Sequence, residues 1–183
     1  MVEIAQSLGA IAELRPAKLA DDRTSLHMVT KYNLGRIRTK ICEPKCIVQL
    51  APTCPFLRES TLNKGIKKVL NENYTSAIGL QRIEHSHPYR ARVLDGDGSF
   101  RNFIRDVDVE SPKFHSRQDL PELWSTCGGI YIRNIQTMDE MDGSTFGFGK
   151  RPYALCIDEI EAVNIDNLVD YEFACFLAEK RSI

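Results

Sequence analysis

Tyr153-Ala-Leu-Cys-Ile157 and Val163-Asn-Ile-Asp166-Asn-Leu-Val-Asp170 are the two stretches that decide how this sequence folds. The first is a short, alternating apolar segment, which predicts a strand. The second begins a helix, because Asn167 and Asp170 are spaced as in a capping box. The apolar face of that helix consists of Val169, Phe173, Phe176 and Leu177. The end of the chain is therefore predicted to be strand, loop and helix.

Asp166 lies in the predicted loop at the carboxyl end of that strand, where open α/β sheets place their ligands. Asp166 and Asp170 suit a metal ion, since carboxylate oxygens bind hard cations. The same two carboxylates also suit a helix N-terminus, where they accept hydrogen bonds and offset the helix dipole. The local sequence leaves both interpretations open.

Composition favours one globular domain covering residues 1–183, with 43% hydrophobic and 27% charged residues. A net charge of -1 provides no field that would attract a nucleic-acid polymer or an anionic membrane, so we expect neither as a partner. No apolar run approaches the roughly 20 residues that cross a bilayer. The first residues do not resemble a signal peptide, so a cytoplasmic protein is expected.

The cysteines do not predict a metal site. Cys42 and Cys46 are the only close pair, and no second pair or well-spaced histidines complete a zinc-binding pattern. The remaining cysteines are scattered, and several lie in apolar surroundings typical of reduced thiols. Those remaining cysteines are Cys54, Cys127, Cys156 and Cys175.

The N-terminal region predicts a helix over residues 2–8, closed by Gly9, and a brief strand over 11–14. A second helix is expected to end near Gly35, with Leu26 and Val29 facing inward. The candidates for its N-cap are Asp21, Asp22 and Thr24.

The middle of the chain alternates strand and helix. Residues 46–50 read as a buried strand that the two prolines of 51–55 bring to an end. A helical stripe follows, and residues 75–80 then read as the next strand. The stripe consists of Leu62, Ile66, Val69 and Leu70. This order predicts a parallel sheet with right-handed crossovers.

Residues 84–125 are predicted to leave the sheet as an excursion. The stretch is polar, and the turn at 95–98 predicts a hairpin between 90–94 and 100–104. A long excursion of this kind is usually a functional loop or an oligomer contact. The strand at 128–132 returns the chain to the sheet, and a glycine-rich loop follows at 143–149.

Seven pieces of the sequence, taken in order, resemble one family. They are Ile4-Ala5 with Gly9-Ala10, Arg15-Pro16 with Leu19-Ala20 and Asp22, Pro52-Thr53-Cys54-Pro55, His87-Pro88, Arg117-Gln-Asp-Leu-Pro121, Gly129-Ile-Tyr131, and Asn164-Ile-Asp166 with Asp170. In this order and spacing they are similar to the acylneuraminate cytidylyltransferases, which make CMP-activated nonulosonic sugars. The resemblance extends over essentially the whole chain.

This resemblance implies a Rossmann-like α/β nucleotidyltransferase fold, with a mostly parallel sheet, flanking helices and a homodimer formed through the excursion. It also implies a Mg²⁺-dependent reaction in which the sugar hydroxyl attacks the α-phosphate of CTP and pyrophosphate leaves. Phosphoryl transfer needs positioning and charge neutralisation, which carboxylate-bound Mg²⁺ can supply.

The resemblance also implies roles for individual residues. Asp166 matches the metal-binding aspartate, and Asn164 stands where many members carry a second aspartate, so the metal would lose one anionic ligand. Arg117 resembles the arginine that receives the sugar carboxylate, a task suited to a guanidinium fork. Asp166 and Arg117 are therefore the expected catalytic residues.

Further residues are expected to bind substrate. They are Arg15 near the nucleotide, Thr53 in the sugar-binding turn, Gln118 beside Arg117, and the aromatic residues Tyr131, Phe146 and Phe148. Ala51 departs from the family pattern, which commonly has glutamine there, so an N-acetylneuraminate or another nonulosonic acid fits equally.

Family members begin with a strand and a glycine-rich, basic loop that grips the CTP phosphates, and this sequence has no counterpart of either. The resemblance thus predicts a domain whose N-terminal strands are missing. Two alternatives remain open: a sugar-acid-binding or dimerising module without a CTP site, and a cytidylyltransferase for a deoxyoctulosonate.

Overall fold

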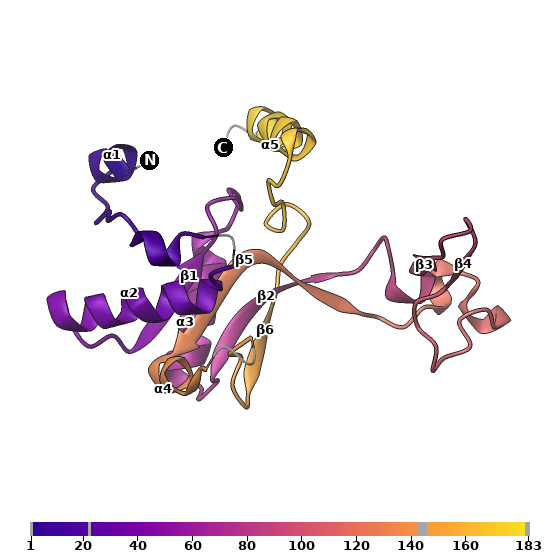
Figure 1. The fold of residues 1–183 in the computed structure, drawn as a ribbon, viewed down its shortest axis with the longest axis horizontal. Helices are drawn as coiled ribbons and strands as arrows, with labels where there is room; N and C mark the ends of the chain where they lie inside the picture. Colours follow the sequence, from indigo (N-terminus) through magenta and orange to yellow (C-terminus); the bar gives the residue numbers. More distant parts are fainter. Residues whose placement is uncertain (1, 22, 143–145, 182–183) are drawn as a thin grey trace.

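A four-stranded sheet with the order β1-β5-β2-β6 forms the centre of the chain, seen in the computed structural model of Figure 1. The structure describes residues 2–21, 23–142 and 146–181; the predicted cap Asp22 and residues 143–145 of the glycine-rich loop lie outside them. The strands are β1 (Cys46–Leu50), β2 (Ser76–Arg82), β5 (Trp124–Asn134) and β6 (Pro152–Cys156).

Three of these strands run in one direction. β5 is antiparallel to both β1 and β2, and β6 is parallel to β2, so β1, β2 and β6 share one direction. The expected α/β sheet with most strands in one direction is confirmed. The sequence did not predict that β5 inserts between β1 and β2, since an antiparallel neighbour leaves no local signal.

Helices cover both faces of the sheet. α3 (Glu59–Asn71) packs three residues of its predicted stripe, Leu62, Ile66 and Val69, against the strands, whose core residues are Ala77, Ile130, Ile132 and Leu155. The fourth, Leu70, is 41% exposed and lies outside this core. α2 (Leu26–Lys40) and α4 (Ile135–Glu140) cover the other face, where Leu34, Met138 and Met141 pack together. The alternation of strand side chains accounts for the two cores, because successive residues point to opposite faces.

Gly65 lets α3 approach the sheet closely. A Cβ at this position would lie 2.5 Å from Ile132 Cδ1 and 2.9 Å from Leu155 Cδ1. Both neighbouring side chains are almost completely buried, so neither has space to withdraw. The helix therefore needs glycine here for packing, although glycine is a poor helix former.

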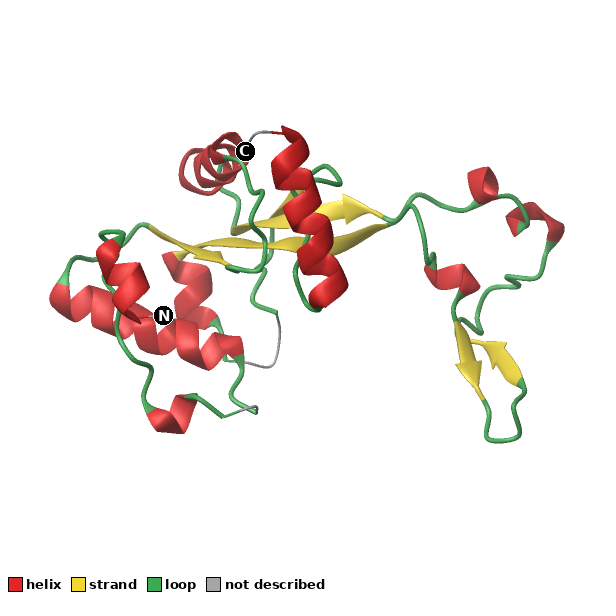
Figure 2. Ribbon diagram, turned by 90° about the horizontal axis from the view of Figure 1, so that it is seen from above, coloured by secondary structure: helices red, strands yellow, loops and turns green. Residues whose placement is uncertain are grey.

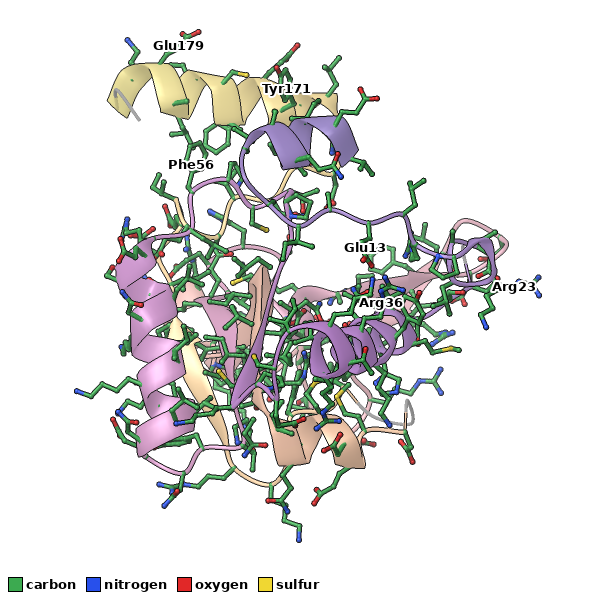
Figure 3. All side chains as sticks on the ribbon, turned by 90° about the vertical axis from the view of Figure 1, so that its left-hand side faces the viewer. Glu13, Arg23, Arg36, Phe56, Tyr171 and Glu179 are labelled. Carbon is green, nitrogen blue, oxygen red and sulfur yellow. The ribbon has the colours of Figure 1, made fainter. Side chains whose placement is uncertain are left out.

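The N-terminal region differs from the prediction after its first helix. α1 (Val2–Ser7) is present as expected, but residues 11–14 form no strand, and Ile11 and Leu14 are more than 80% exposed. Instead, Glu13 points toward α2 in Figure 3 and forms ion pairs with Arg36 and Lys40. Charge pairing, rather than strand pairing, connects this segment to the domain.

α2 also begins and ends elsewhere than predicted. Ser25, not an aspartate, is its N-cap and accepts a hydrogen bond from Met28 N. The helix continues past Gly35 to Lys40, and Leu26 is mostly exposed, so the inward side is formed by Thr30 and Leu34. A short 3-10 helix, η1 (Ala17–Leu19), precedes it.

The excursion projects away from the sheet, as Figures 1 and 2 both show. Its hairpin consists of β3 (Arg92–Leu94) and β4 (Phe100–Asn102), which confirms the predicted turn between them. Three short 3-10 helices complete it: η2 (Pro88–Arg90), η3 (Pro112–Phe114) and η4 (Arg117–Asp119).

α5 (Leu168–Arg181) ends the described chain, and its N-terminus is capped as predicted. Asp170 N donates to Asn167 Oδ1, and Asn167 N donates to a carboxylate oxygen of Asp170, each over 3.1 Å. The predicted apolar face is only partly buried: Leu177 is buried, but Val169, Phe173 and Phe176 are at least half exposed. In Figure 3, Phe56 lies beneath this helix, while Tyr171 and Glu179 lie along it.

All six cysteines are free thiols. Within the described ranges, the structure contains no helix with the length and apolar character needed to cross a membrane.

Candidate functional site

The carboxyl ends of β1, β2 and β6 lie at the same end of the sheet, because these strands run in one direction. Three segments leave the sheet there: the turn at 51–55, the start of the excursion at 83–87, and the loop at 157–166. Ligands of open α/β sheets bind outside such strand ends. The predicted metal and sugar-turn residues all belong to these segments.

The turn at 51–55 and the loop at 157–166 are joined directly. Ile165 N donates to the main-chain oxygen of Thr53 over 2.9 Å, and the Cys54 thiol lies 3.5 Å from Asn164 Oδ1. Asn164 Nδ2 in turn donates to Asp166 Oδ2 over 2.7 Å. Thr53 therefore forms one cluster with Asn164 and Asp166, which lie more than a hundred positions later in the sequence.

Asp166 and Asp170 have different roles in this cluster. The carboxylate of Asp170 accepts hydrogen bonds from the main-chain N–H groups of Asp166 and Asn167, so it caps α5 as the sequence indicated. Asp166 is exposed and contacts the side chain of Asn164. Of the two carboxylates, Asp166 is the one that remains accessible to a cation.

Of the metals that carboxylates bind, Mg²⁺ is the one that the single accessible carboxylate of Asp166 would suit. No group of three His, Cys, Asp or Glu side chains in the described parts of the chain is arranged to hold a metal. Mg²⁺ commonly uses one or two carboxylates and completes its shell with waters and phosphate oxygens. Asp166 supplies a carboxylate, whereas Asn164 turns its amide nitrogen toward Asp166 and its oxygen toward the Cys54 thiol.

Glu161, which the sequence analysis missed, holds the loop against α3. Its side chain is buried, and its Oε1 accepts hydrogen bonds from Arg58 N over 2.9 Å and from the Thr61 hydroxyl over 2.7 Å. Arg58 also pairs with Asp158 over 2.5 Å. The sequence around Glu161 contains no signal for this contact, because Arg58 and Thr61 lie about a hundred positions earlier in the chain.

A second cluster lies where the excursion leaves the sheet. We call it the neck pocket; it has a volume of about 300 Å³. Arg117 donates to the carboxylate of Glu84 there, and Glu84 lies 3.4 Å from the Arg82 guanidinium. The neck pocket is lined by Arg82, Ile83, Glu84, His87, Arg117, Gln118, Leu120, Pro121 and Glu122. The predicted residues Arg117 and Gln118 both line this pocket.

His87 fixes the shape of the neck pocket. Its ring is buried, Nδ1 accepts a hydrogen bond from Tyr89 N over 3.2 Å, and Nε2 lies 3.1 Å from the main-chain oxygen of Pro121. Since Nδ1 is an acceptor, Nε2 carries the proton and donates to Pro121. The imidazole therefore connects the outgoing and returning segments of the excursion.

The predicted aromatic residues lie elsewhere. Phe148 O accepts hydrogen bonds from the hydroxyls of Thr75 and Ser76, at the amino end of β2. The six-residue step from Ser76 to Arg82 spans about 20 Å of strand. Within one chain, Phe146 and Phe148 are therefore not brought together with the carboxyl end of β2.

The buried side chain of Arg133 connects Tyr131 to the main chain of the segment that contains Phe146. The Arg133 guanidinium lies 5.0 Å from the centre of the Tyr131 ring and donates to the main-chain oxygens of Phe146 and Gly147. Burial lowers the pKa of Arg133, while the neighbouring Tyr131 opposes that shift. Arg15, the remaining predicted residue, is exposed on the N-terminal segment.

The fold and the two clusters define an α/β protein with candidate ligand sites at the carboxyl ends of its parallel strands.

No protein-family model matches the chain. It is similar to the N-acylneuraminate cytidylyltransferase of Escherichia coli O18:K1:H7, with 28% identity over 180 residues. It is also similar to the post-translational flagellin modification protein B of Campylobacter coli, with 23% identity over 179 residues.

These similarities cover nearly all of this chain but only part of the relatives. The match spans 98% of this chain and 40% of the Escherichia coli protein. It spans 96% of this chain and 71% of the Campylobacter coli protein. At these identities, they support a distant relationship to cytidylyltransferases and nothing narrower.

Proposed function

We propose that the chain carries part of a cytidylyltransferase, which transfers CMP from CTP to a nonulosonic acid and releases pyrophosphate. The observation that carries the proposal is the contact between the turn at 51–55 and the loop at 157–166. It joins Thr53, Asn164 and Asp166 at the carboxyl end of the sheet. The distant similarity to an N-acylneuraminate cytidylyltransferase supports the same reaction class.

The chemistry assigns different tasks to the two clusters. Mg²⁺ bound at Asp166 would neutralise phosphate charge during transfer of the nucleotidyl group. Asn164 orients the Asp166 carboxylate through its amide hydrogen bond. Arg117 is suited to bind and orient the sugar carboxylate, because a guanidinium makes two parallel bonds to it.

A homodimer through the excursion is part of this proposal. Leu94, Phe100 and Phe103 on and beside the hairpin are all more than 60% exposed. A two-stranded hairpin is only marginally stable in water, and an exposed apolar patch favours contact with another surface. A second copy of the chain supplies such a surface.

Pyrophosphate release tests the proposed reaction. The chain is incubated with CTP, Mg²⁺ and a panel of nonulosonic acids, and release is compared with that of Asp166→Asn. The assay is repeated with the chain joined to a glycine-rich, basic nucleotide-binding segment. We expect release that depends on the sugar acid and falls at least about a hundredfold in the variant. No release from either form refutes the proposal.

A second candidate is a sugar-acid-binding module without catalytic activity. The neck pocket shares no residue with the Asp166 cluster, which favours this candidate, since a carboxylate ligand could bind at Arg117 alone. Calorimetric titration with CTP separates the two candidates. Binding of CTP to the chain supports the transferase, whereas binding of the sugar acid without CTP supports the module.

A further inference from the structure

The neck pocket contains its own carboxylate at the position where an anionic ligand would bind. Arg117 donates to Glu84, and the same carboxylate lies 3.4 Å from Nε of Arg82. A second carboxylate, that of Glu122, lies 3.7 Å from the Arg82 guanidinium. The positive charges of the two arginines and the negative charges of the two glutamates therefore cancel. The pocket has no net charge that would attract anions in general.

We propose that Glu84 is the specificity-determining residue of the neck pocket: it occupies the Arg117 guanidinium until a ligand carboxylate displaces it. The inference rests on the proposed function for the kind of ligand, a hydroxylated sugar acid. It goes further by assigning a role to Glu84 that the proposed reaction does not require.

The exposure of the pair permits this exchange. The Arg117 side chain is 52% exposed and the Glu84 side chain 34% exposed, so the ion pair faces water and is weak. Arg82 remains beside Glu84 when Arg117 is released, so the displaced carboxylate keeps a cationic neighbour. Displacement of Glu84 thus leaves no buried, unpaired charge.

The arrangement also selects among carboxylates. A displaced Glu84 becomes a hydrogen-bond acceptor next to the bound ligand, and Glu122 is a second acceptor in the same pocket. Ligand hydroxyl groups can donate to these oxygens, whereas a second anionic group would be repelled by them. The neck pocket therefore fits a polyhydroxylated monocarboxylate better than a phosphate or a dicarboxylate.

Calorimetric titration with N-acetylneuraminate, without CTP, tests the proposal on four proteins. They are the unmodified chain, Glu84→Gln, Arg117→Gln and the control Glu110→Gln. Glu110 makes an ion pair of the same kind with Arg92, outside the neck pocket, so its substitution matches the change in net charge. Circular dichroism verifies that each variant is folded.

We expect Glu84→Gln to bind N-acetylneuraminate up to about fivefold more tightly, because the competing carboxylate is gone. Glu110→Gln should bind like the unmodified chain, and Arg117→Gln should lose binding. A folded Glu84→Gln that binds equally or more weakly overturns the proposal, because a merely structural role would weaken binding. Absence of binding in every protein overturns it as well.

The two proposals fail in different ways. Tighter binding by Glu84→Gln without pyrophosphate release from any form refutes the transferase but supports the role of Glu84. Pyrophosphate release with no gain in Glu84→Gln refutes the role of Glu84 and leaves the transferase standing.

Discussion

Replacement of Glu161 by alanine tests whether the candidate metal loop is held in place by α3. The side chain is 3% exposed, and one of its oxygens accepts hydrogen bonds from Arg58 N and from the Thr61 hydroxyl. Alanine leaves both donors without this acceptor. Hydrogen bonds to charged groups contribute about 1.5–3 kcal/mol each, and water recovers part of the loss, so we expect destabilisation of about 2–4 kcal/mol.

Urea unfolding followed by far-ultraviolet circular dichroism measures this change in the free energy of unfolding. Glu161→Gln keeps a neutral acceptor oxygen and should lose about half as much, roughly 1–2 kcal/mol. Glu159→Ala in the same loop is the control, since this exposed side chain should change stability by less than about 0.5 kcal/mol. If Glu161→Ala is as stable as the control, the loop is not held by this contact and the reasoning is refuted.

Three further predictions concern packing, metal binding and thiol reactivity. Gly65→Ala should lower the free energy of unfolding by about 1–2 kcal/mol, because the added methyl group overpacks the core. Gly35→Ala has open space around its Cβ and should raise the free energy of unfolding by up to about 1 kcal/mol. Thermal unfolding of both variants measures the two changes. Asn164→Asp adds an anionic ligand and should tighten Mg²⁺ binding about tenfold in calorimetric titration; unchanged affinity would contradict the assigned metal position. Burial raises the pKa of Cys127 from 9.0 to about 11, with a smaller contribution from Cys54. At pH 8, iodoacetamide should therefore label the exposed Cys42 and Cys156 before Cys127, as mass spectrometry would detect. The stability that this raised pKa provides is present below about pH 9 and is lost as the pH rises toward 11.

The elements that sequence analysis predicted well have a strong local pattern. The apolar stripe of α3 and the reciprocal cap at Asn167 are visible in a few consecutive residues, because helix periodicity and capping are local. The position of β5 between β1 and β2 has no such signal, since strand order depends on contacts distant in sequence. Residues 11–14 were predicted as a brief strand, but they form none, and Glu13 pairs with α2 instead.

The sequence indicated which residue types form the candidate site better than it indicated which residues contact each other there. Asp166 and Asn164 contact each other because they lie two positions apart, and their expected role in metal binding stays a prediction. Glu161, Glu84 and Arg133 were missed, since each acts through a partner that the sequence does not place beside it. The roles assigned to Phe146 and Phe148 remain predictions.

β1 has a consequence for how the protein behaves at high concentration. It is an outer strand of the sheet, and its side chains Val48 and Leu50 are 37% and 46% exposed. None of its five residues is charged or proline, the two devices that commonly prevent outer strands from pairing with other chains. The chain should therefore aggregate through this strand at high concentration. The substitution Val48→Lys should raise the concentration at which aggregation begins.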